Sequence, residues 1–428
     1  MKKPGFQQTC MAFLAVILVL AACSKNEPAP PVDGGNGNPD PPVENPDPDP
    51  VDPPATGGIL APCENGMAGS FPCSGYDLVS RQNLTALFAN SANDIWGWTD
   101  PADGTEYALV GLDNGTAFIS LADPVAPVYL GKLPTQTANS LWRDIKVYAN
   151  HAYIVSEAAG HGMQVFDLTQ LRNVSNPPVS FTPTAVYTGF GNAHNIVINE
   201  ASGFGYAVGT GTFGGGPHFV DLSNPASPQA AGGFSGGGYS HDAQVVTYAG
   251  PDTAYTGREI YIGANENEVV VADVTDKANP IRISGLGYSN LGYTHQGWFT
   301  EDQRYFILGD ELDEINFGLN SRTLIFDLGD LDNPVLSFSY SGPTTAIDHN
   351  GYVAGNTFFL ANYTAGVRMI DLSGIGTGSL AETGFFDTFP ASNSPQFDGV
   401  WSIYPYLESG HILVNDISNG LFVLKATP

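Results

Sequence analysis

One pattern recurs at intervals of 47 to 54 residues through most of this chain. Each copy opens with a polar residue and a short apolar run, and further short runs rich in Val, Ile, Phe and Tyr follow. The opening residues are Asp94, Asp144, His194, His241, His295, His349 and Asp398. Runs of this length and composition are strands, and four of them per unit are typical of a propeller blade. The repeat therefore predicts an all-β, seven-bladed β-propeller with four-stranded blades.

The two ends of the repeat array fit a closed ring. The last unit stops near Lys425 after three strands. Residues 77–84 (DLVSRQNL) precede the first unit and alternate suitably to supply the missing outer strand. This pairing would remove an exposed sheet edge, whereas a solenoid would need capping units, which the sequence lacks. We predict that this N-terminal strand closes the ring and that residues 59–428 form the propeller.

The N-terminus has the features of an export signal. Lys2 and Lys3 precede the apolar stretch 11–20, which is shorter than the ~20 residues needed to span a bilayer. Small residues then lead to Cys23 (LAAC), as in the bacterial lipobox, where this cysteine is acylated. We predict a lipoprotein signal peptide over residues 1–22, a lipid anchor at Cys23, and an extracytoplasmic protein on the outer membrane or cell surface. The alternative is an ordinary secretory signal with an incidental cysteine.

Residues 23–58 are dominated by Pro, Asp, Gly and Asn and contain little that a core could bury. We expect this segment to be a disordered tether between membrane and propeller. The whole chain has 43 acidic and 15 basic residues, for a formal net charge of −28. Such a surface repels phosphates, so nucleic acid is not expected as a partner. Cations, basic proteins and neutral glycans remain as partners.

The four cysteines divide by position. Cys10 falls in the predicted signal peptide and Cys23 in the lipobox, which leaves Cys63 and Cys73 close together. In an oxidising compartment, a remaining pair is expected to form a disulfide. A metal-binding pair is the alternative, but the spacing is not that of a CxxC motif.

The turn after the third strand of several units carries a family resemblance. The stretches FVDLSNP (219–225), VADVTD (271–276) and IFDL (325–328) resemble the LVIVD repeat. From Cys63 to the end, the chain is similar to the bacterial choice-of-anchor B family, through WRDIKV, AHNI, GGPHFVDLSNP, THQGWFTEDQRYF, GDELDE and AIDHN. The resemblance implies a propeller-like domain at the cell surface or outside the cell. It brings no established catalytic residues.

An aspartate stands near the end of the third strand in five units: Asp167, Asp221, Asp273, Asp327 and Asp371. Aspartate at a turn accepts backbone N–H bonds and so shapes the bend. Since it recurs from unit to unit, we interpret this aspartate as structural.

Histidine opens the first strand of four consecutive units, at His194, His241, His295 and His349. First strands are innermost in a propeller, so these side chains should meet around the central channel, with Asp94, Asp144 and Asp398 at the matching place in the other units. Loop acids on the same face include Glu311. Such a mouth could hold Zn²⁺ or Fe²⁺ through imidazoles, or Ca²⁺ through oxygens. Alternatively, these residues link neighbouring blades by hydrogen bonds. The polar residues that directly follow the histidines support this alternative, since paired polar side chains can satisfy one another: Asn195, Asp242, Gln296 and Asn350.

No G-x-S-x-G, H-E-x-x-H, P-loop or dinucleotide-binding motif is present. The sequence therefore favours a binding module, with a protein, peptide or glycan as ligand. The alternative function is a metal-dependent enzyme that uses the four channel histidines. The five tryptophans fall in or beside first strands, where most are expected to pack between blades.

Overall fold

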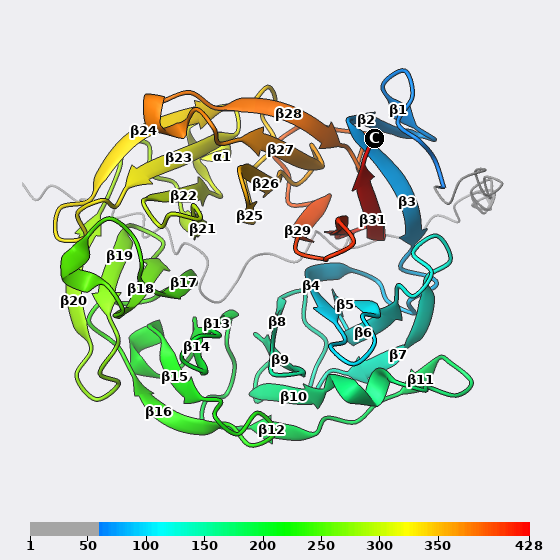
Figure 1. Cartoon of the computed structure of the whole chain (residues 1–428), viewed down its shortest axis with the longest axis horizontal. Coiled ribbons are helices and arrows are strands. Elements are labelled where there is room, and N and C mark those ends of the chain that lie inside the picture. Colours follow the sequence, from blue (N-terminus) through cyan, green and yellow to red (C-terminus); the bar gives the residue numbers. More distant parts are fainter. Residues whose placement is uncertain (1–59) are drawn as a thin grey trace, which may run out of the picture. The chain divides into compact units, whose positions relative to one another are not determined.

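The structure, a computed structural model, describes residues 60–428. The predicted signal peptide, the lipidation site Cys23 and the tether lie outside the described residues. Seven antiparallel sheets stand around a ring, with the chain passing from one to the next in sequence order (Figure 1). The fold class predicted from the repeat is confirmed.

Blades 1 to 4 follow one another along the chain. Their strands, from the inside outward, are β4 (Ala92–Thr99), β5 (Glu106–Leu112), β6 (Gly115–Ser120) and β7 (Val128–Pro134); β8 (Arg143–Tyr148), β9 (His151–Ser156), β10 (Met163–Asp167) and β12 (Ala185–Tyr187); β13 (Asn195–Asn199), β14 (Phe204–Val208), β15 (His218–Asp221) and β16 (Gln229–Gly233); and β17 (Asp242–Thr247), β18 (Glu259–Ala264), β19 (Val269–Asp273) and β20 (Ile281–Leu286). The two-residue strand β11 (Val179–Ser180) adds to the outside of blade 1.

Blades 5 to 7 complete the ring. Their strands are β21 (Thr294–Phe299), β22 (Tyr305–Asp310), β23 (Arg322–Asp327) and β24 (Val335–Ser341); β25 (Gly351–Ala354), β26 (Thr357–Ala361), β27 (Val367–Asp371) and β28 (Ala381–Phe386); and β29 (Val400–Tyr404), β30 (His411–Asp416), β31 (Gly420–Ala426) and β3 (Tyr76–Gln82). Outside β28 lie β2 (Phe71–Ser74) and β1 (Met67–Ala68). Short helices occupy loops: α1 (Asp313–Phe317), η1 (Leu168–Leu171), η2 (Phe213–Gly215), η3 (Thr253–Tyr255) and η4 (Ile375–Thr377). None of the helices within residues 60–428 is long and apolar enough to cross a membrane.

The N-terminal strand closes the ring as predicted. β3 pairs antiparallel with β31, so a strand from near the start of the described residues completes the sheet that the last strand leaves open. Leu78 of β3 is buried in the cluster that packs blade 6 against blade 7. The predicted disulfide between Cys63 and Cys73 is also confirmed. It ties the segment before β1 to β2, which pairs with β28 of blade 6.

The apolar core is divided among the seven blade interfaces. Each of the seven hydrophobic clusters combines side chains from two adjacent blades, including the pair formed by blades 7 and 1. Because alternate side chains of a strand point to opposite faces, each sheet packs against two neighbours. No blade has a core of its own, so ring closure is needed to bury the faces at both ends of the chain.

The third-strand aspartates shape turns, as their repetition predicted. Each accepts a backbone N–H from the residue two positions later, at 2.8 to 3.0 Å. These aspartates therefore have a structural role.

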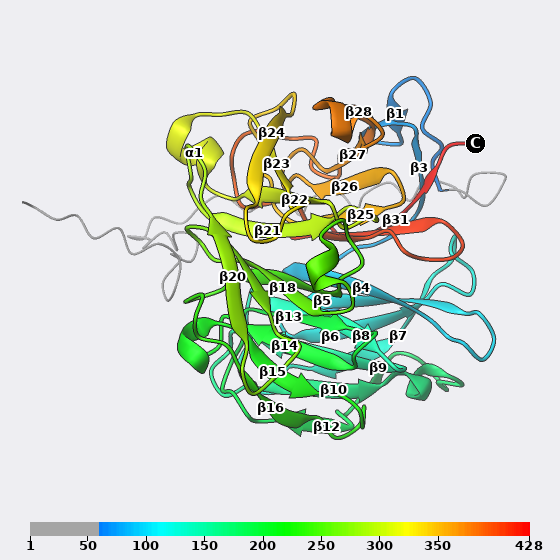
Figure 2. The ribbon, with the colours of Figure 1, turned by 60° about the vertical axis from the view of Figure 1, so that its left-hand side comes forward.

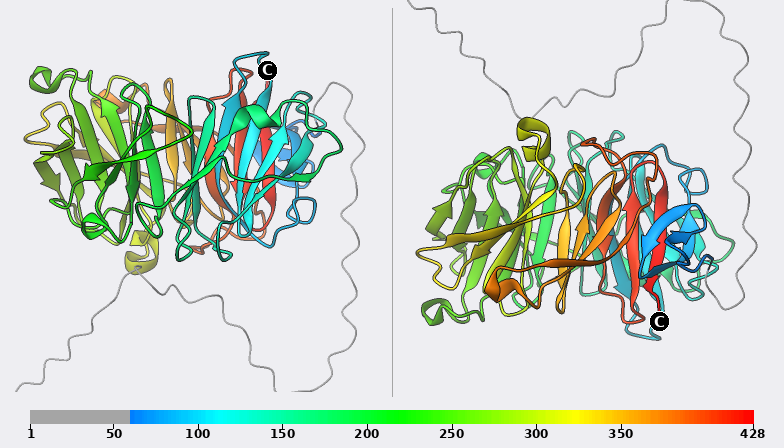
Figure 3. Two further views of the ribbon diagram at one scale, coloured as in Figure 1. Left: turned by 90° about the horizontal axis from the view of Figure 1, so that it is seen from below. Right: turned by 90° about the horizontal axis from the view of Figure 1, so that it is seen from above.

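The first strands begin at one face of the ring, which we call the mouth. Second strands end at this face, so the loop between β22 and β23, which carries α1, also lies there. Figure 2 shows the blades standing side by side around the ring, and Figure 3 shows α1 projecting from one face.

Candidate functional site

The structure brings the four predicted histidines together at the mouth. Consecutive ring centroids are 3.8 Å apart for His194 and His241, 4.3 Å for His241 and His295, and 4.5 Å for His295 and His349. The last three are buried, with at most 6% of their surface exposed. Together the four line a small polar pocket. Its other lining residues are Trp142, Arg143, Asp144, Asn195, Asp242, Asn350 and Trp401.

Hydrogen bonds fix the orientation of three of these imidazoles through Nδ1. His349 Nδ1 donates to the Trp401 carbonyl at 2.6 Å, and His241 Nδ1 donates to the His295 carbonyl at 3.3 Å. His194 Nδ1 donates to Glu157 Oε1 at 2.6 Å. A carbonyl oxygen only accepts, so in the neutral His241 and His349 rings Nε2 carries the lone pair. The bonds of His349 and His241 also join neighbouring blades, so these two histidines link blades as well as lining the pocket.

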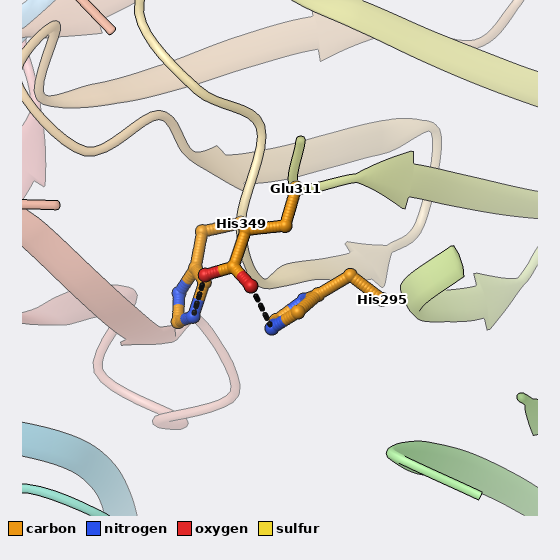
Figure 4. Close-up of side chains that lie close together, drawn as sticks. All are labelled: His295, Glu311 and His349. Carbon is orange, nitrogen blue, oxygen red and sulfur yellow. Dashed lines mark ion pairs between the residues drawn. The ribbon is translucent and has the colours of Figure 1, made fainter. Parts of the chain in front are cut away.

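Glu311 lies between two of the histidines (Figure 4). Its Oε1 is 3.6 Å from His349 Nε2, and its Oε2 is 3.6 Å from His295 Nε2. The Tyr363 hydroxyl donates to Oε1 at 2.9 Å and holds the carboxylate in place. Glu311 follows β22 directly, so the loop that leads into α1 positions it. One ligand atom from each of Glu311, His295 and His349 lies within 4.8 Å of the other two.

Burial controls the protonation of the imidazoles. It lowers the pKa of His241 and of His295 well below the ordinary value, and it lowers the pKa of His349 to about 3. Burial also acts to lower the pKa of His194, but the hydrogen bond and charge of Glu157 outweigh it and raise this pKa. At neutral pH the three deeper imidazoles are therefore neutral, the form that binds metal ions.

Asp94 and Asp144 occupy a layer below the histidines, and here one prediction was wrong. Asp144 pairs with Val155 in the position where Asn195 pairs with Val208, so Asp144 matches Asn195 and not His194. Asp94 Oδ2 accepts from Ile145 N at 2.9 Å. Asp144 Oδ1 accepts from Ile196 N at 3.1 Å, and Gln296 Oε1 accepts from Gly351 N at 2.9 Å. Carboxylates and amides of this layer therefore bridge successive blades, as the alternative of hydrogen-bonded links between blades required.

Asp398 does not join this arrangement. It precedes β29, is half-buried, and accepts from its neighbour Gly399 N at 2.8 Å and from the Ser418 hydroxyl at 2.7 Å. It does not line the mouth pocket. Blade 7 contributes Trp401 there instead.

Lys146 supplies a buried cation that the sequence analysis missed. Its Nζ lies 2.9 and 2.8 Å from the two carboxylate oxygens of Asp144, and 3.5 Å from Asp94 Oδ2. It also stands 4.6 Å from the centre of the Trp96 ring. Burial acts to lower the pKa of Lys146, but the charge of Asp144 outweighs it and raises this pKa. The signal in the sequence was RDIKVY, where lysine follows Asp144 by two residues and so shares its side of the strand.

The carboxylates of this layer bind protons readily. Burial raises the pKa of Asp144 well above the ordinary value, although Lys146 opposes the shift. Burial also raises the pKa of Asp242 to about 6. Asn195 Nδ2 links the two, donating to Asp144 at 3.0 Å and to Asp242 at 2.9 Å.

Aromatic side chains form the next layer along the first strands. Trp96 of blade 1 contacts Tyr404 of blade 7 and Tyr352 of blade 6, with centroids 5.0 and 5.9 Å apart. Tyr352 also contacts Trp298 of blade 5 at 5.0 Å. These rings meet across the middle of the propeller and form a floor below the polar layers. The pocket is therefore approached from the mouth.

The acidic GDELDE stretch leads from β22 into α1 and is largely buried. Asp313 and Glu314 are buried, and Arg322 Nε lies 2.5 Å from Asp313 Oδ2, where it supplies the cation. Burial, with the nearby charges of Asp348 and Asp313, raises the pKa of Glu314 to about 11. Burial likewise raises the pKa of Asp348 to about 7. The cluster anchors the α1 loop that carries Glu311.

Comparisons with known proteins bear on the fold. A model described as the LVIVD repeat matches residues 256–284, which include β18, β19 and the start of β20. No curated protein matches the chain. Among solved structures, the chain is similar to the β-propeller domain of Myceliophteria thermophila Cps50 (Swd1), with 10% identity and a TM-score of 0.46 over 75% of this chain and 94% of that one. It is also similar to Kuenenia stuttgartiensis hydrazine synthase, with 11% identity and a TM-score of 0.52 over 75% of this chain and 92% of that one. At such identity the likeness shows the fold alone.

Proposed function

We propose that this protein is an extracytoplasmic interaction module that binds a ligand in the mouth pocket of its propeller. The observation that carries the proposal is the mouth itself: a small polar pocket above an aromatic floor, at the face where loops from the blades gather. A closed ring holds its loops on a rigid frame, which suits recognition. The LVIVD repeat and the propeller fold support an interaction role.

The ligand class follows from the lining of the pocket. Trp142 and Trp401 are half-buried beside it and offer aromatic faces for stacking on sugars or apolar side chains. Asp144 and Asp242 also line the pocket, at its buried end. With a formal net charge of −28, the protein favours basic or neutral partners. A basic peptide, a protein segment with exposed basic groups, or a neutral glycan fits this chemistry.

Binding at the mouth is testable with defined probes. A glycan array and a phage-displayed library of basic peptides would be screened with the wild type, with Trp142→Ala and with Trp401→Ala. The control is Ile281→Ser, because Ile281 is 62% exposed and begins β20, away from the mouth. Probes that bind the wild type and the control, but bind the tryptophan variants at least tenfold more weakly, would support the proposal. Equal binding to all four proteins, or no binding probe, would overturn it.

We place the protein on the outer membrane or cell surface, anchored by lipid at Cys23. The lipobox-like LAAC sequence and the resemblance to the choice-of-anchor B family support this location. The Cys63–Cys73 disulfide is also typical of proteins outside the cytoplasm. An alkyne-fatty-acid label should enter the wild type but not Cys23→Ala, and protease added to intact cells should cleave the wild type. Equal labelling of both proteins would contradict the anchor.

A metal-dependent enzyme is a second candidate function. The observation that favours it is the position of Glu311 between His295 and His349, with Nε2 of each ring 3.6 Å from a carboxylate oxygen. Turnover that depends on added metal would distinguish this candidate from a pure binding module.

A further inference from the structure

We infer that His295, His349 and Glu311 form a binding site for one divalent first-row transition metal ion, Zn²⁺ or Fe²⁺, with open coordination positions facing the mouth pocket. The inference deepens the second candidate function and rests on that proposal only for the use of the ion in turnover, not for its binding. It does not depend on a partner at the tryptophans or on the lipid anchor.

The distances are those of a site that closes on an ion by small side-chain rotations. Both histidine Nε2 atoms are 3.6 Å from a Glu311 oxygen, and the three ligand atoms lie within 4.8 Å of one another. Ligands bound at about 2.1 Å in tetrahedral geometry are about 3.4 Å apart. The two 3.6 Å distances involve different oxygens of Glu311, so rotation of the carboxylate and of the two rings has to close separations of up to 4.8 Å by about 1.4 Å.

Groups around His349 and Glu311 hold these two ligands in the orientation that a metal requires. His349 donates Nδ1–H to the Trp401 carbonyl at 2.6 Å, which turns the lone pair of Nε2 toward Glu311. The Tyr363 hydroxyl donates to Glu311 Oε1 at 2.9 Å. Metal-binding histidines usually donate their second N–H to a carbonyl or carboxylate, and ligating carboxylates are themselves hydrogen-bonded. Both features are present before any ion binds.

The donor set selects the class of metal. Two imidazoles and one carboxylate suit Zn²⁺ or Fe²⁺, whereas Ca²⁺ and Mg²⁺ prefer oxygen ligands throughout. Three protein ligands are also fewer than the four of a structural zinc site, so positions remain for water or substrate. His241 and His194 continue the row of rings away from Glu311, and His194 is held by Glu157 at 2.6 Å. They line the pocket that the open positions face.

The test measures metal binding by the purified mature protein, stripped with chelator and then titrated with Zn²⁺, anaerobic Fe²⁺, Co²⁺ or Ca²⁺. Isothermal titration gives affinity and stoichiometry, and Co²⁺ gives an absorption spectrum that reports the ligands. Quenching of Trp401 fluorescence by Co²⁺ is a second readout, because the Trp401 ring is 4.9 Å from that of His349. The variants are His295→Ala and Glu311→Gln. His151→Ala, a histidine on the far face at the start of β9, is the matched control.

We expect one ion per chain for the wild type and for His151→Ala, with Ca²⁺ unable to compete. Glu311→Gln keeps the shape of the side chain, so it should fold and bind the ion at least tenfold more weakly. Equal affinity of wild type and Glu311→Gln, or an unloaded wild type after titration with every ion, would overturn the inference. Metal binding without metal-dependent turnover would uphold the site and refute the enzyme. Probe binding that is lost in Trp142→Ala but kept after metal stripping would leave the interaction module standing.

Discussion

Lys146 is the cation of the buried layer below the histidines, and replacing it by methionine tests how that layer is stabilised. Methionine fills most of the same volume but has no charge. The variant leaves Asp144 and Asp94 buried without the ammonium that lies 2.8 and 3.5 Å from them. Removing one partner of a buried ion pair costs more than the pair contributes, because the other charge stays buried.

The magnitude follows from proton binding. In Lys146→Met, we expect one more carboxyl group of the layer to become protonated on folding. An unfolded aspartate has a pKa of about 3.9, so this costs about 4 kcal/mol at pH 7 and about 1.5 kcal/mol at pH 5. The folded variant binds more protons than the unfolded chain, so the loss of stability grows by about 1.4 kcal/mol per pH unit as the pH rises. An unfolding entropy of about 2.1 cal/mol/K per residue converts 4 kcal/mol into a drop of roughly 5 °C in Tm.

The assay is thermal and urea unfolding of wild type and Lys146→Met from pH 5 to pH 8, followed by circular dichroism. Lys425→Met is the control, because Lys425 is exposed near the end of β31 and its loss should change stability by less than about 0.5 kcal/mol. Adding Asp144→Asn to Lys146→Met should recover part of the loss at pH 7. A loss that is the same at pH 5 and pH 8, or below about 1 kcal/mol throughout, would refute the account of the layer as a charge-compensated unit.

Three further predictions concern the stability of the ring. Replacing Cys63 and Cys73 together by serine should cost about 3 kcal/mol, because the disulfide closes a loop with a sequence separation of 10; no change in urea unfolding would contradict this. Glu314→Gln should stay within about 1 kcal/mol of wild type at pH 7, since the raised pKa keeps this carboxyl protonated, while Glu314→Ala should lose about 2 to 3 kcal/mol; equal losses in calorimetry would rule out the protonated form. Leu78→Ala should cost about 2 to 5 kcal/mol, because Leu78 is buried where β3 closes the ring, and a neutral effect compared with exposed Val335→Ala would argue against that closure.

The sequence predicted part of the ligand set at the mouth, namely the histidines, but not the position of Glu311 among them. The recurrence of histidine at one point of the repeat was enough to bring His194, His241, His295 and His349 to the same face. The sequence also placed Glu311 on a loop at that face, but it gave no reason to set Glu311 between two particular rings. That position depends on the path of the α1 loop, which the buried contact between Asp313 and Arg322 fixes.

The place of Asp94 is set by a bulge in its own strand, whereas blade 2, which carries Asp144, pairs without one. The register of the first strand changes at bulges between Ala92 and Ile95 in blade 1 and between Thr294 and Gln296 in blade 5. A bulge adds a residue to one strand, so side chains beyond it change sides. The sequence located each repeat to within one residue. It did not show which side of the strand each side chain would face.

The sequence by itself determined the number of blades, the closing strand, the disulfide and the aspartate turns. These features depend on strand length, alternation and turn chemistry within a few residues, or on the spacing of two cysteines, and such local preferences are written in the order of the residues. Only the tertiary structure decided that Lys146 lies between Asp94 and Asp144, that Glu311 lies between His295 and His349, and that Asp398 stands apart. Lys146 of blade 2 meets Asp94 of blade 1, and Glu311 of blade 5 meets His349 of blade 6, so these distances are set by the packing of neighbouring blades in the ring. Asp398 instead bonds within blade 7, to Gly399 and Ser418.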